Sequence, residues 1–139
     1  MAGAKRFLRV AVVILGLASI AFGIGFIWNG YSYETQLRTQ LATEEVTLGS
    51  EEGNIVDTPE EARNASETVK GHRTERYGTY AQTGRDSPER AQFLNALTLE
   101  NSLNLVQLAF GVTTIAMAIG AFMILNGIAL VGVGLALGL

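Results

Sequence analysis

Two long apolar blocks flank a polar middle segment in this chain. Val10–Trp28 is an uncharged apolar run, and no charged side chain occurs between Asn101 and Leu139. A transmembrane helix needs about 20 apolar residues to cross a hydrocarbon layer of ~30 Å, and both blocks are long enough. The pattern therefore predicts an all-α membrane protein with two transmembrane helices, residues 10–30 and 105–131, that form an antiparallel hairpin.

The distribution of charge predicts how this hairpin is oriented. Lys5, Arg6 and Arg9 make the N-terminus, residues 1–9, basic, and basic residues beside a span favour the cytoplasmic side. Residues 31–100 hold seven Lys/Arg and 13 Asp/Glu, a net charge of 7 − 13 = −6. We therefore expect a cell-membrane protein with both termini cytoplasmic and the acidic middle segment extracytoplasmic.

The first apolar block also has some features of a cleavable signal peptide. A basic start, an apolar run and the small residues of Ser19–Ala21 fit that alternative. However, the apolar run continues to Trp28, which favours a retained anchor. Trp28, Tyr31 and Tyr33 then lie where an aromatic belt at the outer membrane surface is expected.

The middle segment predicts helices that extend beyond the bilayer. Tyr33–Leu48 contains no Pro or Gly, so the first helix, beginning near Lys5, should continue as a stalk until Gly49. The last helix should start at Asp86–Glu89, where a serine precedes a proline, and descend into the membrane.

A short helix between these two should complete a small helical cap. Thr58 is a good N-cap, followed by Pro59 at the first helical position and Glu61 at the third. The helix should run to about Lys70 and end at Gly71, which leaves His72 in a loop.

The second apolar block is longer than one membrane crossing requires. Leu105–Leu139 as a helix would measure about 52 Å, against a hydrocarbon core of ~30 Å. If Asn101, Asn104 and Gln107 mark the outer surface, residues 132–139 are left as an apolar tail. Such a tail should tilt within lipid, lie at the inner surface or pack against another protein.

Glycines recur at seven-residue intervals in both blocks, and small residues let membrane helices approach closely. One interpretation is that the two spans pack on each other; a second is that one stripe docks a partner subunit, and both can hold. Asn126, the strongly polar residue deep in the second span, should form a hydrogen bond between helices. The glycines are Gly16, Gly23 and Gly30 in the first block, and Gly120, Gly127 and Gly134 in the second.

No pattern in the sequence predicts catalysis. The chain has no Cys and one His, His72, whereas a transition-metal site normally uses several such ligands. The paired glutamates, for example Glu44-Glu45, lack the spacing of a calcium loop. We therefore predict no catalytic, cofactor-binding or metal-binding residues and no enzyme. The acidic middle segment also argues against a nucleic-acid partner.

A series of short stretches follows in a fixed order along the chain: Glu44–Thr47, His72, Thr79–Ala81, Arg85–Arg90, Leu97–Leu99 and Ala109–Val112. In this order they resemble small two-pass membrane proteins of actinobacteria whose function is unassigned. Some of these proteins carry the label of aromatic ring-opening dioxygenase, a reaction that needs iron held by two His and a carboxylate; the single His72 does not supply that set. The resemblance covers most of the chain and implies a topology but no reaction.

Two classes of function fit these features. The first is a non-catalytic accessory or structural subunit that packs against a larger membrane complex, such as a respiratory, oxygenase or transport assembly, through the second span and the tail at 132–139. The second is a free-standing envelope protein that associates with itself and senses or binds through its acidic cap. The overlong second block and the glycine stripes favour the first class.

Overall fold

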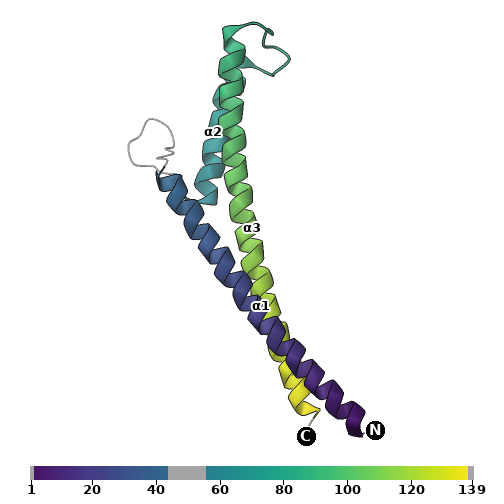
Figure 1. The fold of residues 1–139 in the computed structure, drawn as a ribbon. Coiled ribbons are helices and arrows are strands. Elements are labelled where there is room, and N and C mark those ends of the chain that lie inside the picture. The colour runs from purple at the N-terminus through teal and green to yellow at the C-terminus, as the bar shows by residue number, and fades with distance from the viewer. Residues whose placement is uncertain (1, 44–55, 138–139) are drawn as a thin grey trace. The chain divides into compact units, whose positions relative to one another are not determined.

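The computed structural model describes residues 2–43 and 56–137, which form helices joined by loops and contain no β-strand (Figure 1). The three helices are α1 (Ala2–Thr43), α2 (Pro59–Tyr77) and α3 (Pro88–Ala136). The predicted all-α class is confirmed, as is the start of the last helix at Pro88. The predicted end of the first helix near Gly49 lies outside the described residues.

The chain divides into two compact units. Unit 1 consists of Met1–Tyr33 and Val112–Leu139, and unit 2 consists of Glu34–Gly111. Helices α1 and α3 each contribute to both units, and α2 belongs to unit 2.

Unit 1 is built on the glycines of α1 and α3. A Cβ added at Gly23 would lie 2.5 Å from the carbonyl oxygen of Gly120, and one at Gly16 would lie 2.8 Å from that of Gly127. Since later residues of α1 meet earlier residues of α3, the two helices run antiparallel within this unit. The interpretation that the two glycine stripes pack on each other is confirmed, and the α3 stripe is covered by α1.

The hydrogen bond between these helices comes from a residue that the sequence did not single out for it. Ser19 Oγ donates to the carbonyl oxygen of Met123 at 2.8 Å. Asn126 instead donates from Nδ2 to the carbonyl oxygen of Phe122, 3.0 Å away on its own helix, so its predicted interhelical bond is wrong. Asn126 directly precedes the buried Gly127, and one residue turns a helix by about 100°, which carries its side chain off the contact face.

The far end of α3 also packs on α1. Gly134 is buried, and a Cβ there would lie 2.5 Å from Val13 Cγ2 and 3.4 Å from the carbonyl oxygen of Arg9. Residues 132–136, the start of the apolar tail, therefore continue α3 as a helix beside the first turns of α1.

In unit 2, the start of α2 has the predicted cap. Glu61 N–H donates to Thr58 Oγ1 at 3.2 Å, and Thr58 N–H donates back to Glu61 Oε2 at 3.0 Å, which completes a capping box. Hydrogen bonds lower the pKa of Glu61, first from the Thr58 hydroxyl and then from the Asp57 backbone.

The predicted end of α2 at Gly71 is wrong, because the helix continues to Tyr77. Two side chains beyond Gly71 hold the extra turns against α3: Arg73 pairs with Glu100, and Tyr77 donates to Gln92 Oε1 at 2.5 Å. The helix ends where Gly78 adopts a φ of 68°, a conformation that side-chain-bearing residues rarely take.

The apolar core of unit 2 lies between α2 and α3. Ala62 and Ala65 of α2 pack with Val56 and with Leu103 of α3, and all four are buried. Val69 and Val106 lie against this cluster. Val106, near the start of the overlong apolar block, therefore packs against the core of unit 2, next to Leu103 just before the block.

Candidate functional site

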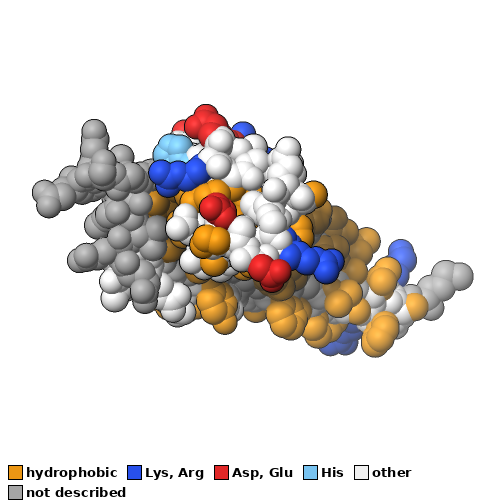
Figure 2. All heavy atoms as spheres, turned by 90° about the horizontal axis from the view of Figure 1, so that it is seen from above, with side chains coloured by type: hydrophobic (Ala, Val, Ile, Leu, Met, Phe, Trp, Pro, Cys, Tyr) orange, Lys and Arg blue, Asp and Glu red, His pale blue; other side chains and the backbone are white. Residues whose placement is uncertain are grey.

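His72, the residue closest to a metal or catalytic candidate in the sequence, lies exposed on α2 (Figure 2). It borders a shallow hollow shared with Arg76, Tyr77 and Gln92. Among residues 2–43 and 56–137, no group of three or more His, Asp or Glu residues could hold a metal ion. The surroundings of His72 therefore offer basic groups, a hydroxyl and the carboxylate of Glu75, without a metal-ligand set.

The most shielded charges of unit 2 form a structural contact. The guanidinium of Arg73 donates from Nε and Nη2 to Glu100 Oε2 at 3.0 and 2.9 Å, and it stacks 4.7 Å from the ring centroid of Phe93. The two charged groups thus neutralise each other, as is usual for ion pairs shielded from solvent. This contact fixes α2 on α3 and leaves neither group for chemistry.

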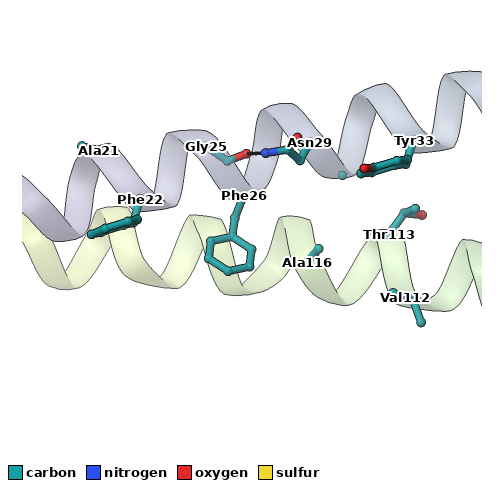
Figure 3. A pocket seen from close by; sticks show the side chains of 10 residues that line it. Ala21, Phe22, Gly25, Phe26, Asn29, Tyr33, Val112, Thr113 and Ala116 are labelled. Carbon is teal, nitrogen blue, oxygen red and sulfur yellow. Dashed lines mark hydrogen bonds between the residues drawn. The ribbon is translucent and has the colours of Figure 1, made fainter.

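The principal hollow of unit 1 is an apolar groove between α1 and α3 (Figure 3). Its volume is about 420 Å³, within the roughly 300–1,000 Å³ of small-molecule sites. No carboxylate, imidazole or amine lines it. We call this feature the interhelical groove, and it is lined by Ala21, Phe22, Gly25, Phe26, Asn29, Gly30, Tyr33, Val112, Thr113 and Ala116.

Polar groups lie towards one end of the interhelical groove. Asn29 and Tyr33 of α1 are there, and Figure 3 shows the bond that Asn29 Nδ2 donates to the Gly25 carbonyl oxygen, 2.9 Å long. Thr113 of α3 adds a hydroxyl near the same end, and the remainder of the lining is hydrocarbon or glycine. The groove can therefore hold an apolar ligand along most of its length, with polar groups at one end.

The sequence contained a signal for this groove that the heptad pattern concealed. Gly25 lies two residues after Gly23, outside the seven-residue series, and a Cβ added at Gly25 would meet nothing within 4 Å. A glycine that packs against no neighbouring helix indicates open space at the surface of the pair.

A second exposed surface follows the side of α3 opposite its contact with α1. Helical periodicity places Ala118, Ala129 and Gly132 on one side of α3, and all three are exposed. A Cβ added at Gly132 would meet nothing within 4 Å. We call these three residues the outer α3 face, and Asn126 lies exposed at its edge.

Helices α1 and α3 are each long and apolar enough to cross a membrane. Only 11% and 17% of their most apolar windows are buried, whereas the core helix of a soluble protein would be mostly buried. Their exposed apolar surface therefore suits lipid better than water.

No family model, curated protein or solved structure matches the chain. The resemblance to two-pass actinobacterial proteins accordingly stays a prediction.

Proposed function

We propose that the protein is a non-catalytic accessory subunit that crosses the cell membrane twice and packs against larger membrane proteins. The observation that carries the proposal is the exposure of apolar side chains along both helices of unit 1, for example Phe22 at 65% and Leu125 at 67%. Surfaces of this kind are stable in lipid or against another apolar surface.

The helix register supports the same assignment. Gly30 lies beside Thr113 and Gly134 lies beside Arg9, so residues 9–30 of α1 face residues 113–134 of α3. Each segment is about 32 Å long, close to the ~30 Å hydrocarbon core. This register favours a second span nearer to 113–134 than to 105–131.

The side chains at the two ends of these segments support an orientation with both termini cytoplasmic. Lys5, Arg6 and Arg9 lie at one end, where positive charge favours the cytoplasm. Trp28 and Tyr31 lie near the other end and are 74% and 66% exposed, as aromatic residues at a membrane surface would be. The acidic unit 2 is then an extracytoplasmic helical cap.

The outer α3 face is the surface that we assign to a partner. The glycine stripe of α3 is covered by α1, so a partner helix has to use another set of small residues. Ala118, Ala129 and Gly132 leave low points around the exposed Leu125 on the same side of α3, against which a partner helix could pack. The neighbouring Asn126 carries amide groups for a hydrogen bond in lipid.

Gentle solubilisation at native abundance, followed by identification of co-purified proteins, tests this function. We expect other membrane subunits to co-purify with the native chain and with Gly25→Leu, but not with Gly132→Leu. Both substitutions add the same side chain at a glycine with open space around it, and only Gly132 belongs to the outer α3 face. Purification of copies of this chain alone would favour the alternative, a self-associating envelope protein.

A further inference from the structure

The interhelical groove of unit 1 is separate from the outer α3 face, so a partner on that face would leave the groove unfilled. Its floor is made by residues with little or no side chain, among them Gly25 and Ala116. Phe22 and Phe26 rise beside this floor and are 65% and 43% exposed. The missing side chain of Gly25 and the small one of Ala116 leave a trough beside these rings, which neighbouring atoms have to fill.

The dimensions of the groove select a thin occupant. From Ala21 to Tyr33 the lining covers 12 residue steps of α1, about 18 Å. A volume of about 420 Å³ spread over that length is too small for a whole helix about 10 Å wide to enter the groove, whereas a slender chain can lie along it.

A single extended hydrocarbon chain does fit, because it is one carbon chain wide and its carbons pack about 4 Å from the carbons around them. The length agrees as well. Half of a ~30 Å hydrocarbon core is about 15 Å, so a groove of about 18 Å covers one leaflet and reaches its polar surface.

The groove is apolar at one end and polar at the other, as a phospholipid is along its acyl chain and head group. The lining from Ala21 to Phe26 is apolar, whereas Asn29 and Tyr33 present amide and hydroxyl groups at the other end. Trp28 and Tyr31, on another side of α1, lie at that polar end too. A tail directed towards Ala21 and a head group near Tyr33 would match apolar with apolar and polar with polar.

We propose that the interhelical groove binds one acyl chain of a phospholipid from the outer leaflet, with its head group beside Asn29 and Tyr33. The proposal rests on the part of the proposed function that places unit 1 in the membrane with Tyr33 at the outer surface. It does not depend on a protein partner, so the lipid proposal and the accessory-subunit proposal can be refuted independently.

The single tryptophan of the chain allows a sharp test. Native Trp28 lies outside the groove, against Ile24 and Ile27, and only two residues from Phe26. A variant with Trp28→Phe and Phe26→Trp therefore moves the reporter into the groove at nearly the same depth. Both proteins are purified in detergent and titrated with a phosphatidylcholine whose acyl chains are brominated, since bromine quenches tryptophan emission on contact.

At an equimolar lipid ratio the groove reporter should lose most of its emission, while native Trp28, which lines a separate hollow of about 310 Å³, should lose clearly less. Unbrominated phosphatidylcholine should restore the emission by competition. Gly25→Leu, added to the groove reporter, should abolish the quenching because the leucine fills the trough. Gly132→Leu adds the same side chain outside the groove and should leave the quenching unchanged.

Equal quenching of the two reporters at every lipid ratio would overturn the proposal, as would unchanged quenching in Gly25→Leu. Failure of the protein to resist alkaline extraction from membranes would instead refute the membrane assignment. Loss of all co-purified subunits with retained quenching would refute only the accessory role.

Discussion

Arg73 of α2 and Glu100 of α3 form the most shielded ion pair in the described part of the chain. Their side chains are 12% and 11% exposed, compared with 69% and 63% for Arg63 and Glu67. The Arg73 guanidinium also lies 4.7 Å from the ring centroid of Phe93. One arginine thus connects the second half of α2 to α3 through a carboxylate and an aromatic ring.

Glu100→Leu should destabilise unit 2 by about 3 kcal/mol, because it leaves the shielded Arg73 without its partner. The double change Arg73→Met with Glu100→Leu should recover most of that loss by removing both charges. Native-state hydrogen exchange of the α2 amides measures the effect. As a control, Arg63→Met breaks the exposed pair and should cost about 0.5 kcal/mol or less. Equal exchange in Glu100→Leu and the native protein would contradict the expectation.

Gly23→Leu should separate α1 from α3 in unit 1. The added Cβ would lie 2.5 Å from the Gly120 carbonyl oxygen, and backbone cannot move aside as a flexible side chain can. Pulsed EPR between spin labels at Ala11 and Ala136 should report a longer, broader distance distribution. The control is Gly25→Leu, two residues away in open space, which should leave the distribution unchanged. A similar response of both variants would show that the glycine contact does not hold the pair.

The sequence predicted the features of the fold that depend on local patterns. The capping box at Thr58 and Glu61 and the seven-residue glycine stripes were readable because each follows from spacing along one helix. The extension of α2 past Gly71 was not, because it depends on Arg73 and Tyr77 meeting residues of α3 far along the chain. The predicted bond of Asn126 was wrong for a different reason. It was based on depth in the span alone, although the glycine stripe already placed Asn126 about 100° away from the contact face.

The candidate site was less predictable than the fold. The interhelical groove is the space left open beside the contact of Gly23 with Gly120. Its shape therefore depends on residues of both α1 and α3. Gly25 alone gave a hint, since it interrupts the heptad series. No property of a single helix would have shown that Asn29 and Tyr33 lie at one end of a trough.

The start of α2 should weaken in acid. Because hydrogen bonds lower the pKa of Glu61 below its ordinary 4.5, its ionised form stabilises the folded state above that value. The contribution is lost as the pH falls below 4.5 through the lowered pKa. The protection of the α2 amides from hydrogen exchange, expressed relative to the intrinsic rate at each pH, should therefore decrease in that range, and Glu61→Gln should remove this change. Glu60→Gln, on the adjacent exposed residue, serves as the control and should retain it.

The topology can be tested with single cysteines, because the native chain has none. Asn64 is exposed on α2, whereas the nearby Ser66 is buried and donates to Asn104 Oδ1 at 2.8 Å. Asn64→Cys is therefore the better probe of unit 2, and Gly3→Cys, with nothing within 4 Å of its Cβ, probes the N-terminus.

In intact cells, an impermeant thiol reagent should label Asn64→Cys and leave Gly3→Cys unlabelled, because basic residues such as Lys5, Arg6 and Arg9 favour the cytoplasmic side of a span. Permeabilised cells provide the control, and both cysteines should react there. Labelling of Gly3→Cys alone in intact cells would mean that the orientation is inverted. Equal labelling of both would mean that the first apolar block does not separate the two positions by a membrane.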